Sequence, residues 1–172
     1  MLAGREALRI SRIAAKGALP APLFVIIAAV AIAACALASW LAGEFAPLLT
    51  GRQKIWFVAA AMVLAALEVI VLRAPVAPRE PTRSLGAIAI VLLAGVLADA
   101  SGLLILSLGV ATAAPLFVAA GGALAVAGVL GAALLAGRDW EKLPLPTMRW
   151  ATGIALLLGA FAIALLSPDA FS

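Results

Sequence analysis

One carboxylate, Asp99, stands in the apolar stretch LLAGVLADASGLLIL, residues 92–106, where the other side chains are aliphatic or a serine hydroxyl. An ionisable group inside a membrane span costs about 2.5 to 3.5 kcal/mol on insertion scales, and it usually marks an ion path or a proton relay. A plainer alternative is a protonated Asp99 that hydrogen-bonds a backbone carbonyl or a serine of a neighbouring helix. Both interpretations require residue 99 to lie inside a helix bundle.

The residue types that most enzymes use are missing from this chain. It contains no histidine and a single cysteine, Cys35, which excludes an intramolecular disulfide, a cysteine and histidine zinc site, and histidine-based catalysis. We therefore expect neither an enzyme nor a bound cofactor. The net charge of +4 could suggest nucleic acid, but basic residues that flank apolar runs belong first to membrane topology, so we expect no nucleic-acid partner.

The composition indicates a chain that lies in a lipid bilayer. Hydrophobic residues make up 66% of it and charged residues only 12%, whereas a water-soluble domain needs a polar coat over most of its outside. A helical span takes about 20 apolar residues, and helices satisfy their backbone hydrogen bonds internally, as lipid requires. We predict an all-α integral membrane protein with about five transmembrane helices, at roughly residues 20–43, 55–73, 85–109, 113–137 and 150–167.

Basic residues are distributed unevenly between the two sides of these spans. One side carries Arg5, Arg9, Arg12, Lys16, Arg73, Arg79, Arg83, Arg138, Lys142 and Arg149, and the other side carries Arg52 and Lys54. By the positive-inside rule, we predict a cytoplasmic N-terminus and an external C-terminus, in a bacterial inner membrane.

The N-terminal residues 1–16 are too short and too charged to span a bilayer. Their basic residues follow one face at helical spacing, which predicts an amphipathic helix on the anionic cytoplasmic leaflet. A basic start, an apolar run and the segment IAAC also have the form of a cleaved signal. We favour a retained span, because the apolar run continues to about residue 43 and has a counterpart later in the chain.

The two halves of the chain resemble each other. The segment PLFV at residues 22–25 recurs at residues 115–118, and, after a slip of one position, Trp56 recurs as Trp150. An odd number of spans separates the copies, so they form an inverted repeat of the kind that secondary transporters use. We assign residues 1–73 to a first repeat with an amphipathic helix and two spans, 74–84 to a Pro-rich cytoplasmic linker, and 85–172 to a second repeat with three spans.

The same alignment brings Asp99 opposite Glu6, the single acid of the N-terminal segment. Within its span, Asp99 shares a helical face with Gly95, Gly102 and Gly109. Small residues allow helices to approach closely in lipid, so we expect Asp99 to point into the bundle. Asp99 and Glu6 are the candidate metal-ion or proton ligands.

These repeats resemble the Gdt family of divalent-cation/proton exchangers, which includes Golgi manganese and calcium transporters and bacterial manganese exporters. That family has six helices in two inverted copies, each of which opens with an E-x-G-D-(K/R)-(T/S) helix. The likeness covers nearly the whole chain, including the closing segment GRDWEKLPLPTMRWATGIALLLGAFAIALL. It implies exchange of Mn2+ or Ca2+ for protons at a carboxylate site. It also implies a bilayer partner and a homodimer or a heterodimer with a complete family member.

The motif itself departs from the family pattern. The second copy reads DASGLL, in which Asp99 keeps the leading acid while Gly102 stands at the second acid; the first copy reads EALRIS, with Glu6 leading and Arg9 at the second acid. A register shifted by two residues would put Asp99 at the glycine position. Hard divalent ions favour six or more oxygen ligands. Two functions therefore stay open: cation/proton exchange, and a non-transporting structural or partner-binding membrane subunit.

Other polar and small residues receive simpler interpretations. We expect Glu68, near the end of its span, to reach toward the cytoplasmic interface. Four tryptophans near span ends, Trp40, Trp56, Trp140 and Trp150, have the position of interfacial anchors. The glycines of the fourth span are expected to provide close contacts for neighbouring helices or for a dimer.

Overall fold

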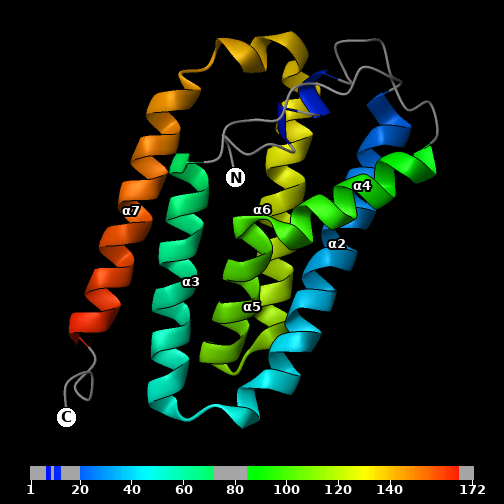
Figure 1. Ribbon diagram of the computed structural model, residues 1–172. Helices are drawn as coiled ribbons and strands as arrows, with labels where there is room; N and C mark the ends of the chain where they lie inside the picture. Colours follow the sequence, from blue (N-terminus) through cyan, green and yellow to red (C-terminus); the bar gives the residue numbers. More distant parts are fainter. Residues whose placement is uncertain (1–6, 9, 13–19, 72–84, 167–172) are drawn as a thin grey trace.

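The computed structural model describes residues 7–8, 10–12, 20–71 and 85–166, and within these ranges every regular element is a helix (Figure 1). The candidate ligand Glu6 and the linker 74–84 lie outside the described residues. The elements are α2 (Pro20–Phe45), η1 (Ala46–Leu48), α3 (Gly51–Val71), α4 (Leu85–Ala98), α5 (Ala100–Thr112), α6 (Pro115–Ala136), η2 (Gly137–Lys142) and α7 (Leu145–Leu166).

The helical class expected from the sequence is confirmed, and so are long apolar helices. Four helices are long and apolar enough to cross a membrane, and the pair Gly86–Ala98 and Ala100–Thr112 makes a fifth if it is counted as one bent span. The segment predicted as the third span consists of two helices that meet at an angle of 56° at Asp99.

Local sequence explains several helix ends. At the start of α3, the Thr50 N–H donates to Gln53 Oε1 at 2.8 Å and the Gln53 N–H donates to Thr50 Oγ1 at 3.4 Å, a reciprocal cap that satisfies two otherwise free donors. Pro115 opens α6, where its missing N–H costs nothing. Ala113 ends α5 in the left-handed region, with φ 52°, so only a tight turn separates α5 from α6.

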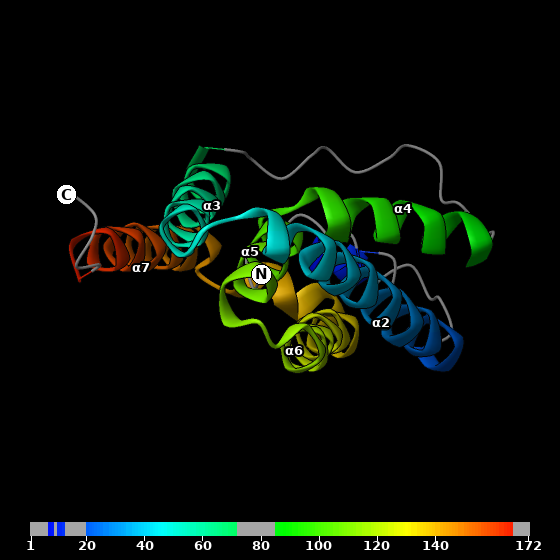
Figure 2. The ribbon, with the colours of Figure 1, turned by 90° about the horizontal axis from the view of Figure 1, so that it is seen from below.

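The long helices form two antiparallel pairs, with α5 between them. Following the chain in Figure 1, α2 and α6 run in opposite directions side by side, as do α3 and α7. Helix α5 packs against α2, α3, α4 and α6, whereas α7 packs on α3 at one edge of the molecule (Figure 2). The described part of α3 is therefore joined to the α2–α6 pair mainly through α5.

The α3–α7 pair is closely packed through glycine. A Cβ atom on Gly153 would lie 2.5 Å from Ile70 Cγ1, and one on Gly159 would lie 2.5 Å from Met62 Cε. Arg149, near the start of α7, donates from Nε to the Val69 carbonyl at 2.8 Å and from Nη2 to the Ile70 carbonyl at 3.4 Å. Carbonyls in the last turn of a helix lack intrahelical partners, so this guanidinium caps α3.

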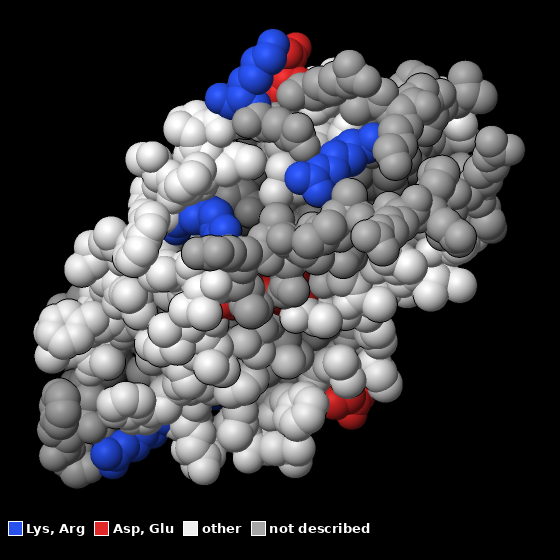
Figure 3. Space-filling view, turned by 45° about the horizontal axis from the view of Figure 1, so that its top comes forward, with Lys and Arg blue, Asp and Glu red and all other residues white. Residues whose placement is uncertain are grey.

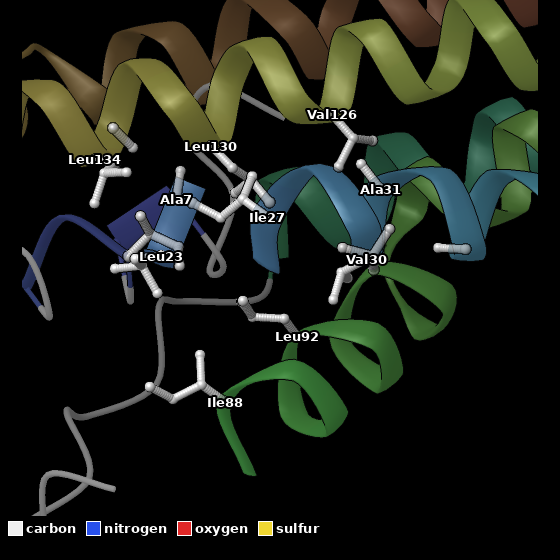
Figure 4. Close-up of a cluster of buried hydrophobic side chains, with 14 of the residues drawn as sticks. Ala7, Leu23, Ile27, Val30, Ala31, Ile88, Leu92, Val126, Leu130 and Leu134 are labelled. Atoms are coloured by element: carbon white, nitrogen blue, oxygen red, sulfur yellow. The ribbon is translucent and has the colours of Figure 1, made fainter. Parts of the chain in front are cut away.

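The main core lies around the first half of α2. Figure 4 shows α2 side chains between α4 and α6, and the N-terminal segment, residues 7–8 and 10–12, adds Ala7 to the same cluster. The labelled members are Ala7, Leu23, Ile27, Val30, Ala31, Ile88, Leu92, Val126, Leu130 and Leu134. Residues 7–8 and 10–12 are helical, and their Ala7, Leu8 and Ile10 side chains are buried against protein. The rest of the segment predicted as an amphipathic helix, residues 1–16, lies outside the described residues.

The tryptophans do not all behave as the sequence predicts. Trp40, Trp56 and Trp150 are exposed, as interfacial anchors would be. The same prediction for Trp140 is wrong, because its side chain in η2 is buried in the core cluster. Because η2 packs against α6, the Trp140 ring is covered by protein.

Charged side chains gather at the helix ends. Lys142 lies in η2 and Arg149 near the start of α7, whereas Arg52 and Lys54 lie in the first turn of α3. Figure 3, in which the end that carries η2 comes forward, shows separate Lys and Arg side chains over that end and another group toward the opposite end. The long middle of the bundle is thus left largely to apolar groups.

Candidate functional site

The candidate site is the junction between α4 and α5. Asp99 is the N-cap of α5 and has extended backbone, with φ −86° and ψ 162°. The N–H groups of Gly102 and Leu103 both donate to the Asp99 carbonyl, at 2.9 and 3.4 Å. The helical ladder therefore restarts at Asp99 instead of continuing from α4.

The Asp99 carboxylate is half-buried at this junction. It makes no hydrogen bond to the first N–H groups of α5, so it does not act as the side-chain cap that aspartate often provides. The N-terminal end of α5 carries a partial positive charge and the C-terminal end of α4 a partial negative charge. Asp99 is thus an acid between two opposed helix ends, free of a local capping role.

Gly102 is the closest contact between the two half-helices. A Cβ atom at this position would lie 2.6 Å from the Leu97 carbonyl oxygen and 2.8 Å from the Val96 carbonyl oxygen. Both oxygens belong to the last turn of α4. The bare glycine therefore allows the end of α4 to rest against the first turn of α5.

Buried hydroxyls lie on the helices around this junction. Ser101 is buried in the first turn of α5, and further along it the buried Ser107 hydroxyl donates to the Leu104 carbonyl at 3.0 Å. Ser39 of α2 is also buried, and its Oγ has no hydrogen-bond partner among the described residues. An unmade bond at a buried hydroxyl costs about 1 to 3 kcal/mol, so Ser39 is a polar feature that apolar packing alone does not explain.

The described residues do not gather a carboxylate cage. No group of three or more His, Cys, Asp or Glu side chains that could hold a metal ion occurs in the described part of the chain. Asp99 is described at the junction, whereas Glu6, its predicted counterpart, lies outside the described residues. The arrangement at residue 99 offers one carboxylate, which can carry one proton or contribute one charged ligand to a cation.

Sequence reasoning missed two polar features of the fold. The sequence predicts only a topological charge for Arg149, which hydrogen-bonds α3. Ser39 gives no signal in the sequence, because a single serine in an apolar helix is common. No local pattern signals either feature, since each depends on which helix packs alongside.

Comparisons of this chain with protein-family models, with curated proteins and with solved structures gave no match.

Proposed function

We propose that this chain is a Gdt-like membrane exchanger, built from two inverted repeats, in which Asp99 binds the exchanged cation or proton. The observation that carries this proposal is an acid at the break between two half-helices of one apolar pair. Acids inside spans are costly and commonly functional. Secondary transporters commonly form their sites at such discontinuous helices, near the repeat interface.

The helix directions support the inverted repeat. Its first copy would supply α2 and α3, and its second copy α6 and α7; each helix runs opposite to its counterpart in Figure 1. The register that pairs Trp56 with Trp150 also pairs small residues along α3 and α7. The pairs are Ala59 with Gly153, Ala65 with Gly159, and Ala66 with Ala160. All six are buried or half-buried, as expected if the copies meet through equivalent faces.

Helix α5 connects Asp99 to the rest of the bundle through its helix contacts. It begins next to Asp99 and packs against both α3 and α2. Neutralising a carboxylate at a helix N-terminus changes its interaction with that helix dipole. In this proposal, loading of Asp99 shifts α5 between the α2–α6 pair and the α3–α7 pair. The N-terminus would be cytoplasmic, as the distribution of basic residues predicts.

The test is cation flux by the purified full chain in proteoliposomes, with Mn2+ or Ca2+ outside and a pH-sensitive dye inside. We expect cation-dependent proton movement from the intact chain and its loss in Asp99→Asn. The matched control is Asp139→Asn, the same chemical change at an exposed loop position, which retains flux. Absence of flux with both ions from the intact, inserted chain would contradict the proposal.

A second function, a non-transporting membrane subunit, is favoured by a different observation. The outward face of α6 exposes Leu116 and Phe117 at 82% and 83%, and Cβ atoms on Gly121 and Gly128 would meet nothing within 4 Å. Such a face can receive lipid or another helix. Helix association in bilayers, measured by energy transfer between two labelled populations of this chain, together with absent flux, would support this alternative.

A further inference from the structure

The bend between α4 and α5 has a strict steric requirement at residue 102. The atoms nearest to a Cβ on Gly102 are the carbonyl oxygens of Leu97 and Val96, at 2.6 and 2.8 Å, and the Leu97 carbonyl carbon at 3.1 Å. All three are backbone atoms, so no side-chain rotation can relieve the contact. A methyl group at this position requires the end of α4 to move relative to α5.

Other tight glycines approach side-chain atoms instead. Cβ atoms on Gly109, Gly122, Gly153 and Gly159 would come within 3.0 Å of side-chain atoms only. At Gly109 that atom is the fixed Cβ of Ala42, whereas at the other three it belongs to a longer side chain that can move. On α6, Gly128 has open space. Among the described glycines, Gly102 is thus distinguished by its close approach to backbone oxygens.

Proline, a common cause of a sharp kink, is absent from residues 85–112. A neighbouring serine and glycine are another known cause, and Ser101 and Gly102 stand together at this bend. The Asp99 side chain makes no cap hydrogen bond that would force the ladder to restart. The glycine contact remains as the local feature that matches the bent geometry.

We propose that Gly102 is a positioning residue for Asp99. Its missing side chain lets the last carbonyls of α4 lie against the first turn of α5, which sets the 56° bend and fixes the carboxylate between the two helix ends. The importance of this position for transport rests on the function proposed above. The bend itself can be measured without transport.

The primary experiment compares Gly102→Ala with Gly128→Ala, the same substitution in an unobstructed helix. Spin labels replace the exposed Val91 of α4 and Leu108 of α5, with Cys35 changed to Ala, in the full chain in lipid nanodiscs. We expect the distance distribution between the labels to shift or broaden in Gly102→Ala and to stay unchanged in Gly128→Ala. An unchanged distribution in both variants overturns the proposal.

A second measurement reports on the carboxylate itself. The infrared band of Asp99, assigned by its loss in Asp99→Asn, is expected to change frequency in Gly102→Ala and not in Gly128→Ala. A purely structural role, such as general loosening of the bundle, would not single out this band. The same band in all three proteins that retain Asp99 would contradict a positioning role.

A third variant keeps the test decisive if Gly102→Ala does not insert. Asp99→Ala leaves Gly102 intact, so we expect the spin-label distances of the bent pair to persist. Straightening of the pair in Asp99→Ala would assign the bend to the acid and overturn the proposal. Wild-type chain that shows the expected distances but no flux would refute the transport function and leave the positioning role standing.

Discussion

The α2–α6 and α3–α7 pairs differ in how they are covered. Helix α2 is buried by α4, α5 and α6, while α7 packs on α3 at the edge of the bundle. The segment PLFV is helical in both α2 and α6, but its buried Leu23 in α2 corresponds to Leu116 in α6, which is 82% exposed. The same short sequence therefore forms a helix in both places, whereas its burial depends on whether a third helix lies alongside.

The largest expected effect is at the contact between α2 and α5. A Cβ atom on Gly109 would lie 2.7 Å from the Cβ of Ala42, and neither group can rotate away. We expect Gly109→Ala to lower the free energy of unfolding by about 1 to 3 kcal/mol, as overpacking does. The measurement is reversible denaturation in mixed micelles.

Its control is the compensating change. Ala42→Gly makes room for the added methyl, so the double variant should recover most of the loss, a coupling that a double-mutant cycle detects. Simple additivity of the two substitutions would show that α2 and α5 do not meet at these residues.

The next largest effect on stability is expected at Arg149, whose hydrogen bonds join α7 to α3. Removing the Arg149 side chain leaves the Val69 and Ile70 carbonyls without their donors. We expect Arg149→Ala to cost about 1.5 to 2 kcal/mol, in the lower part of the range for hydrogen bonds to charged groups. Arg149→Lys, which keeps the charge without the planar fork, should fall between. The measurement is thermal unfolding. Equal stability of the Lys variant and wild type would mean that the positive charge alone, without the planar guanidinium, accounts for the stabilisation.

A smaller effect of opposite sign is expected on the uncovered face of α6. Gly128 has open space for a methyl group, and alanine favours helix over glycine by up to about 1 kcal/mol. Gly128→Ala should therefore leave stability unchanged or raise it slightly in the same denaturation assay. A clear loss of stability would mean that another helix covers this face and would remove the contrast between α6 and α2.

The smallest effect is expected in η2, which connects the two pairs. Asp139 accepts a hydrogen bond from Lys142. This bond, together with the charge of Lys142, lowers the pKa of Asp139. The same bond, together with the charge of Asp139, raises the pKa of Lys142. The pair thus stabilises the fold above the ordinary Asp range. Its contribution is lost as pH falls through the lowered Asp139 pKa or rises through the raised Lys142 pKa.

Because both side chains are exposed, solvent screens this interaction. Thermal midpoints of wild type and Asp139→Asn, followed over pH, should differ only slightly between those two limits and converge below the lower one. A large difference at neutral pH would contradict an exposed pair.

The apolar spans could be predicted from the sequence because long hydrophobic runs have few alternatives to helices in lipid. The break at Asp99 could not. The segment ADASG contains an acid of a type that can precede a helix. No proline interrupts the apolar run, however, so its hydropathy predicts one continuous span. The decisive contact joins Gly102 to carbonyls five and six residues earlier, and that contact exists only once the helix is bent.

The candidate site, too, could be predicted only in part from the sequence. Asp99 is conspicuous in the sequence because a charge in an apolar run is costly. Gly102 was interpreted as a lost acid and as part of a small-residue face, and neither interpretation includes its steric role. Arg149 and Val69 are separated by 80 positions in the chain, so their hydrogen bond follows from the packing of α7 on α3.

The central place of α5 has a consequence for biogenesis. In the described part of the chain, α2 and α3 are held together mainly through α5, although α5 is synthesised after both. The first two long helices to leave the ribosome therefore have few contacts with each other until residues 100–112 have been made. Assembly of the bundle is thus expected to wait for α5, and a chain truncated before α5 is expected to leave α2 and α3 without the helix that joins them.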